Sequence, residues 1–424
     1  MKKIEVPQLG EARYKSPVSY TVPDNVFIPS SVQWKSAEAP QDLLLFEKAG
    51  PRSWIYFDPI QVRAGILTCG GLSPGLNNII RSVVVELNNG FGVSSVLGFR
   101  EGYRGLDPAG GQEPVELTIS LVDHIHQHGG TILGTSRGPV NIGIALETLI
   151  KHRIQILFVV GGDGTQRGAN ELFKEAARRN YPLAVVGIPK TIDNDIPFVT
   201  RTFGFTTAVD AVRNVISLAH TESTSVRNGI ALVKVMGRNA GFIAAGATVA
   251  SQQVHFCLIP ESPFVLEGEG GFLSCLEKCV QAQRHAVIVV AEGAGQELFK
   301  SGDLGKDASG NAKLHDVGAF LSQQIISYFK SRKIEMILRY FDPSYQIRSC
   351  PANTEDAVLC DRFARLAVHA GMAGKTGLMI GFINGQFIHV PFELSINNVK
   401  RLDLDGELWY AVLSTTKQPP SFRP

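Results

Sequence analysis

Six short runs of apolar, largely β-branched residues constrain the fold of this chain more than any other feature of its sequence. Each run is apolar at consecutive positions and ends in glycine or polar residues, as strands do when both faces of a parallel sheet are covered. The stretches between them, such as 77–89 and 169–179, have the apolar spacing of helices. We therefore predict an α/β chain with Rossmann-like layers of helix, sheet and helix. The runs are RAGILTCGG (63–71), ILFVVGGDG (156–164), LAVVGIPKT (183–191), GIALVKVMGR (229–238), VHFCLIPES (254–262) and AVIVVAEGAG (286–295).

The polar endings of these runs are the expected place for a ligand. In open parallel sheets, ligands bind beyond the carboxyl ends of the strands. We therefore expect the endings to form the rim of an active site.

Length and charge restrict the classes of protein that remain. A chain of 424 residues exceeds the roughly 250–300 that one core usually supports, so we expect about two domains. Residues 1–62 contain several prolines and show no sustained apolar period. We therefore predict that they form an extension. The chain has 41 Lys and Arg against 39 Asp and Glu, with no long charged block that would bind nucleic acid or a membrane surface. Small molecules and further copies of the chain are the expected partners.

The cysteines and the first residues predict a cellular location. Six cysteines form no CxxC pair, and we expect them to be reduced. MKKIEVPQLG has two lysines without an apolar segment behind them, so a secretory signal is not expected. We predict a cytoplasmic protein.

Two glycine-containing segments each follow a predicted strand and precede a predicted helix. In LTCGGLSPGLN (67–77), glycines without a Cβ would let backbone amides approach an anion, although a tight turn alone also explains them. VVGGDGTQRGAN (159–170) adds Asp163, whose carboxylate could bind Mg²⁺, and Thr165, which could add a hydroxyl. This pattern indicates a phosphoryl donor and leaves the acceptor open.

PKTIDNDIP (189–197) places Asp193 and Asp195 on either side of Asn194, with Lys190 just before them. A hydroxyl that attacks a terminal phosphate must lose its proton, and a carboxylate within hydrogen-bond reach can accept it. One aspartate is therefore predicted to be the base, while the other and Asn194 order the loop or a metal's water shell. Lys190 would face the phosphoryl oxygens. An Asx-rich turn with solvated acids remains the alternative.

Nine motifs in sequence order resemble those of the 6-phosphofructokinases, and the similarity extends from about Phe46 to the end of the chain. EKAGPRSWIYF, ahead of the first strand, is similar to the long-chain branch of ATP-dependent members. The motifs are LTCGGLSPGLN, GFREGYRGL, LGTSRGPV, VVGGDGT, PKTIDND, TFGFTTA, KVMGRNAGF, VAEG and DPSYQIRS.

This resemblance implies a fold, an activity and a division of the chain. It implies the phosphofructokinase fold, with two Rossmann-like three-layer domains and an N-terminal extension over 1–62. Residues 63–205 with about 349–398 would bind the nucleotide, and residues 206–348 with about 399–424 the sugar phosphate. The implied enzyme moves the γ-phosphate of ATP to fructose 6-phosphate with Mg²⁺ and forms a homo-oligomer, a tetramer or a dimer.

The resemblance also implies roles for individual residues. Asp193 would accept the proton of the C1 hydroxyl, Glu292 would accept a hydrogen bond from a substrate hydroxyl, and Asp163 would hold Mg²⁺. The expected catalytic residues are Asp193, Asp195, Lys190, Thr191 and Arg238. The expected nucleotide-binding residues are Gly70, Gly71, Arg137, Gly138, Gly162, Asp163, Gly164 and Thr165. The expected sugar-phosphate residues are Thr191, Asp193, Met236, Gly237, Arg238, Glu292, Arg339, Tyr345 and Arg348, with the last three on the 6-phosphate.

Two departures from the family pattern and three alternative functions accompany these expectations. Gly229 stands where the short allosteric members carry an arginine, which puts the substrate contact across their subunit interface in doubt. Lys190 is shared with pyrophosphate-dependent members, whereas Gly164 leaves the room that ATP needs, so pyrophosphate is the alternative donor. A catalytically silent regulatory subunit would have lost acids that are present here, and a nicotinamide dehydrogenase would need a GxGxxG motif with an acid about 20 residues later, which does not appear.

Overall fold

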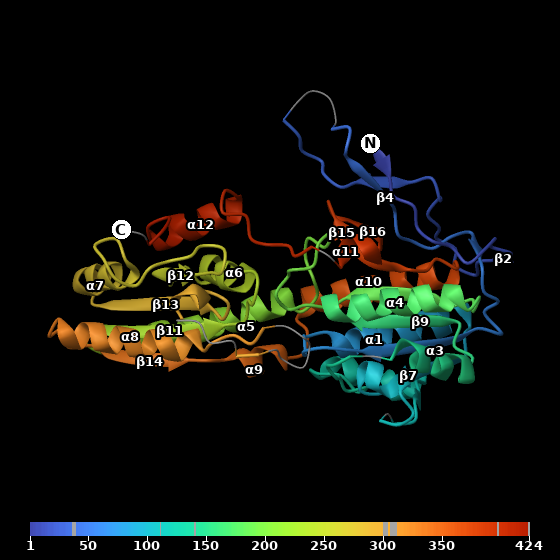
Figure 1. Cartoon of the computed structure of the whole chain (residues 1–424), viewed down its shortest axis with the longest axis horizontal. Coiled ribbons are helices and arrows are strands. Elements are labelled where there is room, and N and C mark those ends of the chain that lie inside the picture. The colour runs from blue at the N-terminus through green and yellow to red at the C-terminus, as the bar shows by residue number, and fades with distance from the viewer. Residues whose placement is uncertain are drawn as a thin grey trace. The chain divides into compact units, whose positions relative to one another are not determined.

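The computed structural model describes residues 1–35, 40–110, 112–139, 141–299, 304–305, 312–396 and 398–422. The chain divides into two compact units, each with its own sheet (Figure 1). Unit 1 comprises Met1–Ile192, Ile196–Gly204 and Ser349–Asn398. Unit 2 comprises Asp193–Asp195, Phe205–Arg348 and Val399–Pro424.

Unit 1 is built around a seven-stranded sheet whose five inner strands are parallel and whose two outer strands are antiparallel to their neighbours. β9 (Ile156–Gly161) and β10 (Ala184–Pro189) are buried at every position, as their unbroken apolar sequences predict. Across the sheet the strands are β16 (Gln386–Pro391), β15 (Leu378–Ile383), β10 (Ala184–Pro189), β9 (Ile156–Gly161), β6 (Arg63–Thr68), β7 (Ser95–Phe99) and β8 (Val115–Glu116).

Helices cover both faces of this sheet. A Cβ added to Gly371 of α10 would lie 2.7 Å from Ile156, whereas one added to Gly187, which is in register with Val159, would lie 2.1 Å from Gln166 of α4. Positions 156 and 159 point to opposite faces because side chains alternate along a strand. The helices are α1 (Leu76–Val85), which packs on α10 (Thr354–Met372), and α3 (Ile142–Lys151), which packs on α4 (Asp163–Arg178).

The strand order of unit 1 reverses between β6 and β9. From β6 the chain moves to β7 on one side, and β9 then pairs with β6 on the other side. In doubly wound sheets such a reversal opens a crevice beyond the carboxyl ends of the two strands. The segments that follow β6 and β9 are the two glycine-containing segments of the sequence.

Unit 2 contains a four-stranded parallel sheet, also covered on both faces. Ile230, Leu232 and Ile288 point toward a core that α7 and α8 share, and α5 and α6 pack together on the sheet as well. Its strands, across the sheet, are β12 (Phe256–Leu258), β13 (His285–Ala291), β11 (Gly229–Val235) and β14 (Ile337–Phe341). Its helices are α5 (Phe205–Thr224), α6 (Phe242–Ser251), α7 (Phe272–Gln283), α8 (Val317–Ser331), α9 (Ser344–Arg348) and α12 (Glu407–Thr416). The order reverses at β11, since β13 and β14 flank it.

The first 62 residues form short strands that belong to unit 1. β4 lies between β1 and β3, and β2 pairs with β5. These strands are β1 (Lys2–Lys3), β2 (Tyr14–Lys15), β3 (Phe27–Pro29), β4 (Leu44–Glu47) and β5 (Trp54–Ile55), and the remaining short helices of unit 1 include α2 (Ile119–Val122) and α11 (Phe392–Ser395). Across the described parts of the chain, no helix combines the length and apolar character needed to cross a membrane.

Candidate active site

The segment after β6 brings two cations against two glycines. A Cβ on Gly70 would lie 3.1 Å from Lys190 Nζ, and one on Gly71 would lie 3.2 Å from Arg137 Nη2. Gly70 has φ +84°, a left-handed conformation that glycine adopts at little cost. Lys190 Nζ donates a hydrogen bond to the Gly71 carbonyl at 2.7 Å. Positive charge and accessible backbone therefore meet at this turn, the combination that binds phosphates.

The segment after β9 continues directly into α4. Gly162 is the N-cap residue and Asp163 is the first helical residue, so the carboxylate lies at the positive end of a 16-residue helix. Asp163 Oδ2 pairs with Arg167, whereas its Oδ1 is buried and accepts no hydrogen bond from any residue that the structure describes. A Cβ on Gly164 would meet no atom within 4 Å. An oxygen ligand for a cation and open space thus lie side by side.

Thr165 and Gly138 differ in how they fit the predicted phosphate site. The Thr165 side chain is buried against Gly161, where an added Cβ would lie 2.4 Å from its Oγ1, and the Tyr103 hydroxyl donates to the Thr165 carbonyl at 2.7 Å. Thr165 therefore packs the helix against the strand. Gly138 has φ +131° and open space around an added Cβ.

In unit 2, the DND turn brings Asp193 to the carboxyl end of β11. The Arg238 backbone N–H lies 3.5 Å from Asp193 Oδ2. Asn194 is buried and has φ +58°, a left-handed conformation that asparagine tolerates better than most residues. The Lys400 backbone N–H donates to the Asp195 carbonyl at 2.9 Å, and burial lowers the pKa of the Lys400 ammonium to about 7 against the opposing charge of Asp195.

The ends of β11 and β13 bring Glu292 near a cluster of cations. The Gly293 N–H donates to the Gly237 carbonyl at 3.1 Å, which joins the two strand ends. Burial raises the pKa of the Glu292 carboxyl, and the charges of Arg238, Lys234 and Arg348 partly oppose that rise. A carboxylate and two guanidinium groups thus interact at the ends of these strands, and their roles in binding a sugar phosphate stay predictions.

The remaining sugar-phosphate candidates lie in three environments. The Arg348 guanidinium lies over the exposed ring of Tyr345, 4.4 Å from its centroid. Arg339 lies within β14, ahead of its carboxyl end, and pairs with Glu222 of α5 at 3.6 Å. Met236 is largely buried.

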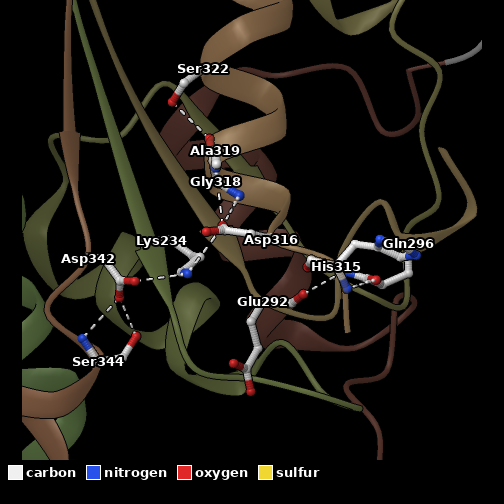
Figure 2. A network of polar contacts seen from close by, with 10 residues as sticks. All are labelled: Lys234, Glu292, Gln296, His315, Asp316, Gly318, Ala319, Ser322, Asp342 and Ser344. Carbon is white, nitrogen blue, oxygen red and sulfur yellow. Dashed lines mark hydrogen bonds and ion pairs between the residues drawn. The ribbon is translucent and has the colours of Figure 1, made fainter. Parts of the chain in front are cut away.

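The sequence analysis missed a polar network around Lys234, which Figure 2 shows next to Glu292. Lys234 Nζ lies 2.9 Å from Asp342 Oδ2 and 3.3 Å from Asp316 Oδ1. Gln296 links the Glu292 carbonyl to His315 through its amide group. A lysine inside the apolar run GIALVKVMGR was the available signal, because an ammonium in a buried strand needs counter-charges.

Each unit therefore contains part of the residues that the sequence predicts for the site. Unit 1 offers cations, backbone amides and Asp163 to a phosphorylated ligand, while unit 2 offers Asp193, Glu292 and guanidinium groups. Within the described ranges, no group of three or more His, Cys, Asp or Glu side chains is arranged to hold a metal ion. A cation bound at Asp163 would need further oxygen ligands from a substrate or water, which is how Mg²⁺ usually binds beside phosphates.

Comparisons with known proteins agree on one family. The family model described as phosphofructokinase matches residues 63–371. An ATP-dependent 6-phosphofructokinase of Amycolatopsis methanolica is 44% identical over 99% of this chain and 95% of its own. An ATP-dependent 6-phosphofructokinase of Borreliella burgdorferi is 46% identical over 90% of this chain and 87% of its own. A pyrophosphate-dependent phosphofructokinase of Marinobacter aquaeolei, known from its crystal structure, has a TM-score of 0.69 at 21% identity, covering 86% of this chain and 93% of its own. That structural likeness concerns the fold alone.

Proposed function

The chain belongs to the phosphofructokinase family, and we propose that it transfers the γ-phosphate of ATP to the C1 hydroxyl of fructose 6-phosphate, giving fructose 1,6-bisphosphate and ADP. Two relatives named for the ATP-dependent activity support this proposal, since they match nearly the full length of the chain. The observation that carries it within the structure is the approach of the Asp193 carboxylate to the Arg238 N–H at the end of β11. This contact keeps the carboxylate oriented at a strand end where a substrate hydroxyl can reach it.

Unit 2 is proposed to bind and deprotonate the sugar phosphate. Asp193 accepts the C1 proton as the new O–P bond forms. Glu292, whose pKa burial raises and the neighbouring cations partly lower, accepts a hydrogen bond from a sugar hydroxyl, and Arg348 with Tyr345 binds the 6-phosphate. Arg238 neutralises charge on the transferred phosphoryl group. Thr191, Asp195, Met236, Gly237 and Arg339 remain proposed contacts or supports.

Unit 1 is proposed to bind the donor. Gly70, Gly71, Gly138 and Gly162 leave room for the phosphates, and Arg137 and Lys190 face their oxygens. The buried, unbonded Oδ1 of Asp163 and the open space at Gly164 fit an Mg²⁺ ion held jointly by Asp163 and the phosphates. When bound, Mg²⁺ would offset the negative charge of the donor. Thr165 supports this turn by packing the start of α4 against Gly161 of β9.

Pyrophosphate is the alternative donor because Lys190 lies beside Gly70 and Gly71. We favour ATP because the space at Gly164 is open, and a nucleotide needs it for the α-phosphate and the nucleoside. An aspartate at this position would occupy the space and repel the α-phosphate.

The test is an aldolase-coupled assay of the wild type and Gly164→Asp with fructose 6-phosphate and either ATP or pyrophosphate. We expect the wild type to use ATP, and Gly164→Asp to lose at least about a hundredfold in kcat/KM for ATP, since like charges in a dehydrated site cost several kcal/mol. Gly143→Ala, in a helix of the same unit, is the control for glycine replacement. A wild type that prefers pyrophosphate would contradict the proposed donor, and unchanged ATP use by Gly164→Asp would contradict the steric argument.

The location in the cytoplasm and the assembly into a dimer or tetramer belong to the same proposal. Neither depends on the site residues described above. Light scattering of the purified protein measures the assembly directly.

A further inference from the structure

Lys234 places an ammonium near the carboxyl end of an otherwise apolar strand. It follows Val233 and precedes Val235 in β11, and its side chain is 15% exposed. A charge at such a position costs desolvation energy and must be offset by counter-charges. Two carboxylates supply them, Asp316 and Asp342 (Figure 2).

Each of these carboxylates also holds a helix start. Asp316 is the N-cap residue of α8, and its Oδ1 accepts the N–H groups of Gly318 and Ala319 at 3.1 Å. Asp342 Oδ1 accepts the Ser344 hydroxyl at 2.6 Å and the Ser344 N–H at 3.3 Å, which closes the turn into α9. One ammonium therefore connects β11, the strand that precedes Arg238, with the first residues of both helices.

The short helix α9 carries both Tyr345 and Arg348. It has five residues and one buried residue, Ile347, so its own packing constrains it weakly. The turn at Asp342 ties the start of this helix to the end of β14, and α9 also packs against α5. A clamp on a phosphate needs its guanidinium fixed, because a displacement of about 1 Å can cost a hundredfold in rate.

We propose that Lys234 is a positioning residue for the fructose 6-phosphate site: by bridging Asp342 and Asp316, it fixes α9, and with it Arg348, relative to Arg238 at the end of β11. This inference rests on the proposed function. It assigns a positioning role to a residue outside the proposed substrate contacts. Lys234 acts on the sugar phosphate through α9 and leaves the donor site of unit 1 unaffected.

The charge of Lys234 has a second, separable consequence at Glu292. The charges that act on the Glu292 carboxyl are those of Lys234 in β11, Arg238 after it, Arg348 in α9 and Asp342 after β14. Lys234 opposes the rise in the pKa of Glu292, whereas Asp342 adds to it. Removing the charge of Lys234 should raise the pKa of Glu292. As the pH falls, the loss of fructose 6-phosphate binding should then begin at a higher pH. Removing the Asp342 charge should move it to a lower pH.

The experiment compares Lys234→Met, Lys234→Arg and Asp342→Asn in the full chain, with Lys330→Met as the control. Lys330 is an exposed lysine of α8 in the same unit. We expect Lys234→Met to raise the KM for fructose 6-phosphate about tenfold, as the loss of a charged hydrogen bond does. The KM for ATP should stay within about twofold of the wild-type value. Lys234→Arg keeps the charge and should restore most of the affinity. Lys330→Met should match the wild type.

The pH profile separates positioning from a merely structural role. The acid limb of fructose 6-phosphate affinity, measured by kinetics and by calorimetric binding of the sugar phosphate alone, should move to higher pH in Lys234→Met and to lower pH in Asp342→Asn. If Lys234→Met does not fold, the other two variants still test the inference. The acid limb should move to lower pH in Asp342→Asn and should stay where it is in Lys234→Arg. Equal changes in both KM values, or a lower melting temperature with unchanged kinetics, would overturn it. A wild type without ATP-dependent phosphorylation of fructose 6-phosphate would instead overturn the proposed function.

Discussion

Asp193 depends on its neighbour for its orientation. Asn194 adopts a left-handed backbone conformation, which turns the chain between two carboxylates and leaves Asp193 Oδ2 facing the Arg238 N–H. A side-chain amide at position 193 has nearly the same shape as the carboxylate but cannot accept a proton. The chemistry and the fold of this turn can therefore be tested separately.

Asp193→Asn is predicted to lower kcat by about 10² to 10⁴, the usual range for removing a positioned base. Binding of fructose 6-phosphate should change little because the polar contact to Arg238 persists. Steady-state kinetics with ATP measure the first effect, and calorimetry with the sugar phosphate alone measures the second. Turnover like that of the wild type in the folded variant would remove Asp193 from the proposed mechanism.

The junction of β11 and β13 shows how two strands together form one part of the candidate site. Gly293 follows Glu292 and donates to the Gly237 carbonyl, and a Cβ on Gly293 would lie 1.9 Å from the Arg238 carbonyl oxygen. No side chain fits there without moving the backbone that carries Arg238. The close approach of two strand ends, more than the conformation of either one, keeps Glu292 and Arg238 together.

Gly293→Ala is predicted to lower kcat/KM for fructose 6-phosphate by at least about a hundredfold, because a shift near 1 Å of a positioned group has this effect. Gly143→Ala provides the matched control, since its Cβ would approach side-chain ends and no backbone, Arg179 Nη2 at 3.4 Å and Asn141 Oδ1 at 3.5 Å. It should leave the kinetics unchanged. Equal behaviour of the two alanine variants would show that the strand junction tolerates a side chain.

A buried group of charges joins the N-terminal strands to the large sheet of unit 1. Glu47 of β4 lies 2.8 Å from Lys375 Nζ and 2.5 Å from an Arg52 guanidinium nitrogen, and His389 of β16 lies 3.4 Å away. Burial alone would raise the pKa of the Glu47 carboxyl, but the hydrogen bond and charge of His389, with the charge of Lys375, hold it well below its ordinary 4.5. Arg52, Lys375 and His389, which are far apart in the sequence, are thus held together by the ionised carboxylate of Glu47.

Glu47→Gln is predicted to lower the free energy of unfolding by about 3–5 kcal/mol at neutral pH, because it leaves the buried Lys375 without its carboxylate and Arg52 with only the exposed Asp24. Since the folded pKa of Glu47 is depressed, its contribution is present above about pH 4.5 and is lost as the pH falls further. Denaturant unfolding measures the free energy of unfolding of both proteins. The difference in this free energy between the variant and the wild type should become smaller below that pH. Glu393→Gln, at an exposed pair with Lys174, should cost less than about 1 kcal/mol. Similar costs for both variants would contradict this account.

Several predictions from the sequence are confirmed and others remain predictions. The α/β fold with helices on both faces of each sheet and the membership in the phosphofructokinase family are confirmed. The domain boundaries and the roles of individual site residues stay predictions. Lys234 with its two carboxylates, the pairing of Arg339 with Glu222 and the buried charges around Glu47 were not foreseen from the sequence.

The physical reason for this division is the distance along the chain over which each interaction acts. Strand runs, glycine turns and the DND segment are local patterns, so period, backbone freedom and side-chain chemistry can be deduced from neighbouring residues. Lys234 meets Asp316 and Asp342, and Glu47 meets Lys375, only after strands from distant segments have been ordered into sheets. A lysine or glutamate in the sequence shows that a buried charge will need a partner, but sheet order and register determine which residue that partner is.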